Sequence, residues 1–283
     1  MKETSEDQEK ASIFEKIKNS DNKIVSILRE FLWVIIVVGA IAALLFAVSG
    51  TWPAVVTIES ESMVPHMNVG DLVFVVQADR FGQLQSWTEV KETGYTKFGD
   101  YGDVIIYNPN GGTNSPIPFI GGAHPIIHRA MFNQSTGPLV VFYNPQGGKF
   151  SPTEYEKISV KNPDEFNSLI KNSSLDRNKG YQIAIENLSI HSGYITKGDN
   201  NQISDEGSSL SHYVNLGPIE PVKPEWIVGK ALFTVPLVGY LPLNIIPVAI
   251  IIILLILLHE WYLRKQENAK NPTNKSKKNK QKK

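Results

Sequence analysis

Two long apolar segments without charge constrain the fold of this 283-residue chain more than any other feature. Residues 31–49 contain no charged side chain, and residues 245–258 are the densest part of a second uncharged stretch, 231–258. A helix that is apolar on every face is either a buried core helix or a membrane span, and about 20 such residues cross the hydrocarbon layer. We therefore predict transmembrane helices at residues 31–50 and 241–263.

The distribution of charge around these segments predicts a topology. Residues 1–30 carry 6 basic and 7 acidic side chains, residues 51–240 carry 13 and 19, and residues 259–283 carry 9 and 2. Cytoplasmic segments beside membrane helices are enriched in Lys and Arg. We therefore expect a multi-pass protein of the cell membrane with a cytoplasmic N-terminal segment (1–30), an extracytoplasmic domain (51–240) and a basic cytoplasmic tail (264–283).

The first apolar segment could instead be a cleavable secretory signal, because Ala47-Val48-Ser49 has a small-x-small pattern. The 30 residues before it include seven acids, and its apolar run exceeds the ~7–15 residues usual in a signal. Both features favour an uncleaved anchor.

Residues 51–240 are the part of the chain large enough to form a folded domain. Short runs rich in Val, Ile, Phe and Tyr alternate there with clusters of Gly, Pro and Asn, which is typical of strands and turns. The runs are 71–78, 103–109, 138–144, 181–190 and 226–235. We predict a mainly β domain between the two transmembrane helices.

Several functional classes lack their usual sequence signals. The chain has no Cys, which excludes a thiol nucleophile and a disulfide scaffold. No Walker A, GxGxxG, HExxH or GxSxG motif occurs. Pro125 separates His124 from His128, so a helical pair of metal ligands is disfavoured. We expect no metal, no cofactor and no nucleic-acid partner.

Three segments contain candidate catalytic residues. Ser60 and Ser62 flank one residue and point the same way in an extended segment, so one could attack a carbonyl while the other stabilises an oxyanion. His128 is a candidate base for such a serine. Asp199 lies in a Gly-Asp-Asn segment, and Asp205 follows it. Gly-Asp-Asn is also ordinary turn chemistry, and the segment could belong to a calcium loop, although EF-hand spacing is absent.

Taken together and in this order, the segments resemble the conserved boxes of type I signal peptidases, specifically the archaeal and endoplasmic-reticulum branch. The matching segments are 60–75 (SESMVPHMNVGDLVFV), 102–109 (GDVIIYNP), 125–129 (PIIHR), 193–205 (GYITKGDNNQISD) and 226–241 (WIVGKALFTVPLVGYL). The resemblance implies a mostly β protease domain at the outer membrane face, cleaving signal peptides from exported preproteins after small residues. Residues 79–101 and 145–180 match no box and resemble insertions.

The resemblance also implies roles for individual residues. Ser62 corresponds to the nucleophile, and Ser60 to the hydroxyl that lines the oxyanion hole beside the Ser62 backbone N–H. His128 occupies the position of the general base, where the bacterial branch has Lys. Asp199 and Asp205 match two acidic positions, one of which supports the base; we favour Asp205.

The implied partners are preproteins that carry signal peptides, the lipid bilayer and the protein translocation machinery. Two alternatives remain open at the level of sequence. The chain could be a non-catalytic β domain, such as a pseudoprotease subunit that binds preproteins, or a surface domain that binds calcium through residues 198–205.

Overall fold

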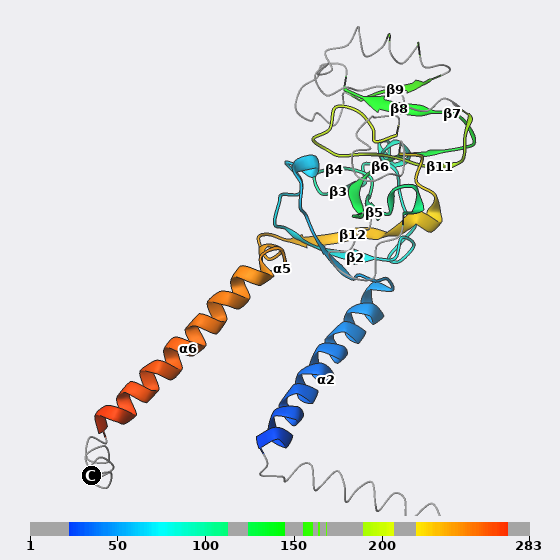
Figure 1. Ribbon diagram of the computed structural model, residues 1–283. Coiled ribbons are helices and arrows are strands. Elements are labelled where there is room, and N and C mark those ends of the chain that lie inside the picture. The colour runs from blue at the N-terminus through cyan, green and yellow to red at the C-terminus, as the bar shows by residue number, and fades with distance from the viewer. Residues whose placement is uncertain are drawn as a thin grey trace, which may run out of the picture.

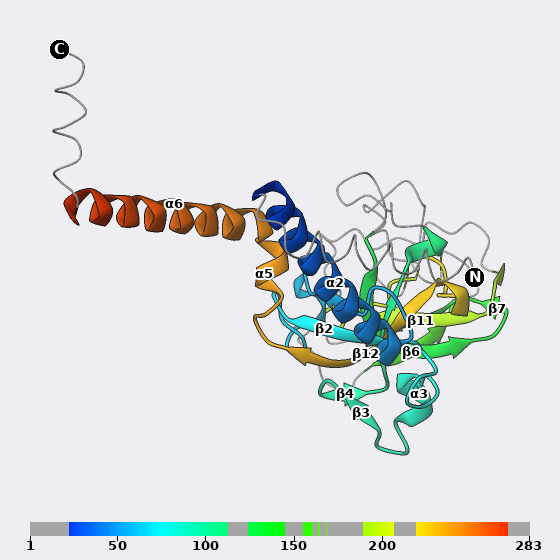
Figure 2. The same cartoon turned by 90° about the horizontal axis from the view of Figure 1, so that it is seen from below.

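The computed structural model describes residues 23–112, 124–144, 155–160, 164, 168, 189–206 and 219–270. A mainly β domain lies between two long helices, α2 (Lys23–Ser49) and α6 (Ile245–Lys270). Both helices leave the same side of the domain (Figure 1), and they diverge from one another when seen from below (Figure 2). The expected combination of a β domain with two apolar helices is therefore confirmed.

The main sheet of the described domain contains six antiparallel strands. In order across the sheet they are β1 (Val55–Thr57), β2 (Leu72–Val76), β12 (Ile227–Val235), β5 (Val104–Tyr107), β6 (Ile126–Gln134) and β11 (Gly193–Lys197). Two-stranded ribbons pair β3 (Thr96–Lys97) with β4 (Asp100–Tyr101), β7 (Gly137–Pro138) with β10 (Ser189–Ile190), and β8 (Val140–Tyr143) with β9 (Glu156–Ser159). Short helices are α3 (Trp87–Val90), α5 (Tyr240–Leu243), η1 (Glu61–Met63), η2 (Pro109–Gly111) and η4 (Pro224–Trp226), the last three being 3₁₀ turns.

Strand β5 lies inside the sheet with both of its faces covered. Val104 and Ile106 pack in the cluster that contains Met63, whereas Ile105 and Tyr107 pack on the opposite face. A strand buried on both faces needs a continuous apolar run rather than alternation, and VIIY supplies one. The core on either side of β5 therefore fixes β6, which lies next to it and carries His128.

The predicted strands differ in how closely the structure follows them. Runs 71–78, 103–109 and 226–235 contain β2, β5 and β12. Run 138–144 divides between β7 and β8, and 181–190 lies outside the described residues except for β10.

Two helices are long and apolar enough to cross a membrane, at Leu28–Ser49 and Ile246–Leu263. None of their most apolar window is buried within the structure, unlike a core helix of a soluble domain. Their bounds differ from the expected ones, because α2 begins at Lys23 and the second segment is interrupted. Asn244, with φ −114° and ψ 32°, separates α5 from α6, and α6 continues to Lys270.

Candidate active site

Ser62 lies in η1, the 3₁₀ turn that follows β1, and its Oγ is 3.1 Å from Oγ of Ser60. Ser60 has an extended backbone. The side chain of Met63 is buried in the core and anchors the turn there. The prediction that the two hydroxyls point the same way is confirmed, although Ser62 itself is in a 3₁₀ turn rather than a strand. Two hydroxyls at this spacing can serve as a nucleophile and as a neighbouring hydrogen-bond donor.

The turn after β11 fastens the Ser62 segment to the sheet. The backbone N–H of Asn200 donates to the Ser62 carbonyl at 2.7 Å, and its side-chain amide donates to the Glu61 carbonyl at 3.1 Å. A Cβ added to Gly198 would lie 2.8 Å from the Ser62 carbonyl oxygen and 2.9 Å from Nε2 of His128. The Ser62 backbone and the ring of His128 therefore both lie against Gly198.

His128 is buried on β6 and is oriented by Asp205. Its Nδ1 lies 2.5 Å from Oδ2 of Asp205. Because an ionised carboxylate only accepts hydrogen bonds, the ring proton belongs on Nδ1, which leaves the lone pair on Nε2 facing Gly198. Among the described residues, the Ser62 hydroxyl hydrogen-bonds Ser60 and not His128. Catalytic hydrogen bonds often tighten only when substrate binds.

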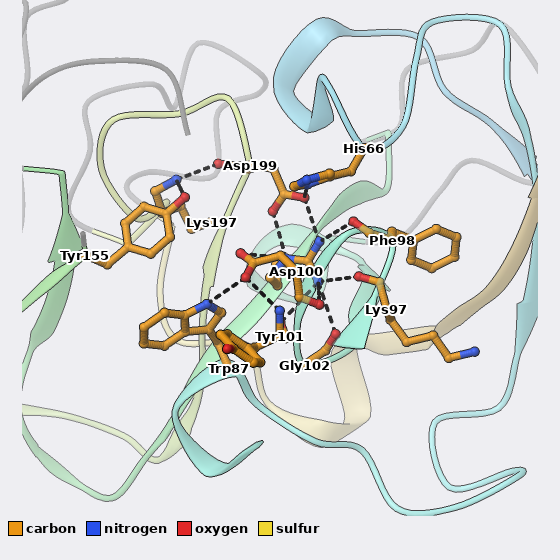
Figure 3. Close-up of polar contacts among 12 residues, drawn as sticks. His66, Trp87, Lys97, Phe98, Asp100, Tyr101, Gly102, Tyr155, Lys197 and Asp199 are labelled. Atoms are coloured by element: carbon orange, nitrogen blue, oxygen red, sulfur yellow. Dashed lines mark hydrogen bonds and ion pairs between the residues drawn. The ribbon is translucent and has the colours of Figure 1, made fainter. Parts of the chain in front are cut away.

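The hydrogen-bond partners of Asp199 differ from those of Asp205. Oδ2 of Asp199 accepts from Nδ1 of His66 at 2.8 Å, and its two oxygens accept from Nε and Nη2 of Arg129 at 2.8 and 2.7 Å. Burial alone would raise the pKa of Asp199, but the hydrogen bonds from His66 and Arg129 and the charge of Arg129 outweigh it and lower the pKa. Figure 3 shows the His66 ring next to Asp199. Asp205, and not Asp199, is therefore the carboxylate in contact with His128.

Arg129 connects this second cluster to the chain between β3 and β5. Its guanidinium is fully buried and donates to backbone carbonyls as well as to Asp199. The carbonyls belong to Lys97, Phe98, Asp100, Tyr101 and Gly102. Residues 79–101, which the sequence suggested to be an insertion, thus supply part of the structure behind the site and contain α3, β3 and β4. The other suggested insertion, 145–180, lies almost wholly outside the described residues.

Lys197 adds a buried cation to the same turn. Its Nζ donates to the Gly198 carbonyl at 2.9 Å and to the Tyr155 hydroxyl at 3.2 Å. Burial lowers the pKa of Lys197 to about 8, although Asp199 and Asp205 act in the opposite direction. The ammonium group therefore helps to hold the carbonyl of Gly198, against which both Ser62 and His128 lie.

Sequence reasoning did not assign a role to several residues that contact the site. They are His66, Tyr107, Arg129, Thr196, Lys197, Asn200 and Glu206. All but Glu206 lie in segments that carried the family resemblance, so their segments could be singled out but their contacts could not.

The calcium alternative finds little support in the loop geometry. Asp199 is engaged by His66 and Arg129, and Asp205 by His128. Within the described ranges, no group of three or more His, Cys, Asp or Glu side chains could hold a metal ion. A comparison with protein-family models and with curated proteins finds no match to this chain.

Proposed function

We propose that this chain is a membrane-anchored serine endopeptidase that removes signal peptides from exported preproteins. The observation that carries the proposal is the orientation of His128, whose Nδ1 is bound by Asp205 while its Nε2 faces the turn that holds Ser62. A serine, a histidine and an aspartate in this relation can perform acyl transfer. The resemblance of five ordered segments to signal peptidases supports the substrate class.

In the proposed reaction, Nε2 of His128 accepts the Ser62 proton as Oγ of Ser62 attacks the scissile carbonyl. The oxyanion that forms accepts hydrogen bonds from the Ser62 backbone N–H and the Ser60 hydroxyl. The imidazolium, stabilised by Asp205, then protonates the leaving amine, and the acyl-enzyme forms. Water deprotonated by His128 hydrolyses this ester and regenerates Ser62.

The two unburied apolar helices support a position in the bilayer. The lysine-rich C-terminal segment favours cytoplasmic termini, and the β domain would then lie on the opposite side. That side is where an exported preprotein emerges with its signal peptide still in the membrane. The membrane position and the peptidase chemistry are therefore consistent with one substrate.

The proposal is tested by cleavage of a model preprotein, with small residues at −3 and −1, by the full chain in detergent. We expect Ser62→Ala and His128→Ala to lower the rate about 10³-fold or more. Ser135→Ala and His191→Ala are matched controls at other positions of the β domain and should cleave at the wild-type rate.

Each other outcome has a defined meaning. Wild-type cleavage by Ser62→Ala would refute the serine mechanism. Loss of cleavage in His66→Ala, together with retained cleavage in His128→Ala, would show that His66 and not His128 is the base. Tight binding of the preprotein without cleavage by the wild type would instead identify a pseudoprotease subunit.

A further inference from the structure

Glu206 is a fully buried carboxyl group next to Asp205. Its two carboxyl oxygens accept from the backbone N–H of Thr196 at 2.9 and 3.0 Å, and its Oε1 lies 2.9 Å from Oγ1 of Thr196. The same Thr196 hydroxyl lies 2.8 Å from Oδ2 of Asp205. One hydroxyl group therefore connects two buried carboxyl groups, of which one contacts His128.

The available hydrogens decide how these groups are protonated. Oγ1 of Thr196 carries one hydrogen but lies within hydrogen-bonding distance of Asp205, of Glu206 and, at 3.0 Å, of the Tyr107 hydroxyl. The Tyr107 hydroxyl also reaches Oδ2 of Asp205 at 3.0 Å and can donate there. If both carboxyl groups were ionised, one contact between Thr196 and a carboxylate would have no hydrogen, and lone pairs would face each other in a buried site.

One proton on Glu206 removes this conflict. Oε1–H of Glu206 then donates to Oγ1 of Thr196, Oγ1–H donates to Oδ2 of Asp205, and Oε2 of Glu206 still accepts from the Thr196 N–H. The proton cannot be placed on Asp205 as easily, because Oδ2 already accepts from Tyr107 and His128.

The electrostatics agree with this assignment. Burial, and then the charge of Asp205, raise the pKa of Glu206 well above its usual value. Burial, and then the charge of Asp205, also raise the pKa of Tyr107, so its hydroxyl keeps its proton and remains a donor. A neutral Glu206 also avoids a second negative charge beside Asp205.

We propose that Glu206 is a neutral carboxylic acid that positions Asp205 through the Thr196 hydroxyl. The proposal rests on the Ser62–His128–Asp205 function, and Glu206 acts as a positioning residue because its side chain, among the described residues, hydrogen-bonds Thr196 and not His128. The chain from Glu206 through Thr196 directs a hydrogen onto Oδ2 of Asp205 and so limits the orientations open to that carboxylate. The carboxylate in turn keeps the proton on Nδ1 of His128.

The first test is kinetic and uses the full chain in detergent with a model preprotein. Glu206→Ala and Thr196→Val should lower kcat about tenfold to a hundredfold, the equivalent of one hydrogen bond to a charged group, with KM unchanged. The acid limb of the pH profile should move to higher pH in Thr196→Val, because Asp205 loses a donor and favours the imidazolium more, and in Glu206→Ala, because the Thr196 hydroxyl is no longer directed onto Asp205. Glu206→Gln, whose amide can replace the neutral acid, should restore both kcat and the acid limb.

The second test does not depend on catalysis. Infrared spectroscopy of the folded protein should show the carbonyl stretch of a protonated carboxyl group at neutral pH. Glu206→Gln should remove this band, and Thr196→Val should shift it, because the hydrogen bond to Oγ1 is lost. Asp205→Asn should leave the band present.

Two results would overturn the proposal. One is the absence of the protonated-carboxyl band in the wild type. The other is an acid limb that moves to lower pH in Glu206→Gln, which is the effect of removing a negative charge. If instead Ser62→Ala cleaves like the wild type, the peptidase function fails, while the infrared result still decides the protonation of Glu206.

Discussion

His128 and Arg129 are adjacent on β6, and their side chains point to opposite faces of the strand. His128 meets Asp205 on one face, while Arg129 meets Asp199 on the other. The two aspartates of one loop therefore have different partners. Asp205 hydrogen-bonds His128, the proposed base, whereas Asp199 neutralises a buried guanidinium and binds His66.

Asparagine substitutions should separate these roles. Asp205→Asn should lower kcat/KM about 10³- to 10⁴-fold because the imidazole loses the acceptor that fixes its tautomer. Asp199→Asn should instead cost about 3 kcal/mol of unfolding free energy, because the buried Arg129 loses the carboxylate that it hydrogen-bonds and is left with the more distant Asp100, whose Oδ2 lies 3.8 Å from Nε. Preprotein cleavage and thermal unfolding in detergent measure the two effects. An unfolding loss that is larger for Asp205→Asn than for Asp199→Asn would contradict this division.

The residue types of the site were predictable, and their pairing was only partly so. Ser60 and Ser62 could be placed on one side of the chain by their spacing. The choice between Asp199 and Asp205 depends on how the turn after β11 folds over two faces of β6, which no local pattern encodes. Glu206 was missed because an acidic residue in a loop is usually solvated, and only the structure shows its burial.

At the scale of elements, the turn after β11 contacts both η1, which carries Ser62, and His128 on β6. Asn200 binds the backbone of η1, Lys197 binds the carbonyl of Gly198, and Gly198 itself lies against Ser62 and His128. A glycine is required there for space, because the Ser62 carbonyl oxygen and Nε2 of His128 lie close to where a side chain would begin.

Gly198→Ala should therefore lower cleavage while leaving the β domain folded. The added Cβ would approach the Ser62 carbonyl and Nε2 of His128 to 2.8 and 2.9 Å, so the turn must move away and separate the two. We expect a loss of kcat of about 10²-fold, as for small displacements of reacting groups. Gly39→Ala in α2 is the matched control, since its Cβ meets nothing within 4 Å. Equal rates for the two variants would show that Gly198 does not set the geometry.

Element prediction succeeded where hydrophobic pattern determines structure and failed where side chains override it. The short, mainly apolar runs predicted β2, β5 and β12. The break at Asn244 was not foreseen, because the segment is uncharged throughout and its end is set by a local backbone turn. Residues 79–101 were judged by their polarity, but four of their carbonyls accept hydrogen bonds from Arg129, and that partner is distant in sequence.

On the scale of the whole molecule, α2 and α6 present apolar side chains that the rest of the described structure does not cover. A soluble chain would expose this surface to water at high cost in free energy. The charge excess of residues 259–283, 9 basic against 2 acidic side chains, predicts a preferred orientation in a bilayer. The two apolar helices could be predicted from composition and are present in the structure, whereas the orientation stays a prediction.

The absence of Cys makes this orientation directly testable, since any introduced thiol is unique. Thr93→Cys places a thiol at an exposed position of the β domain, Lys283→Cys places one at the end of the basic segment, and Val37→Cys places one within α2. If the β domain faces outward as proposed, a membrane-impermeant maleimide added to intact cells should label the Thr93 variant. The Lys283 variant should then react only after the membrane is permeabilised, since the proposed orientation places its lysines on the cytoplasmic side. The Val37 variant should stay unlabelled until detergent is added, because a thiol in hydrocarbon ionises poorly and the reagent does not reach it.

Labelling of the Lys283 variant in intact cells, with the Thr93 variant protected, would invert the topology and place Ser62 on the side where exported substrates do not emerge.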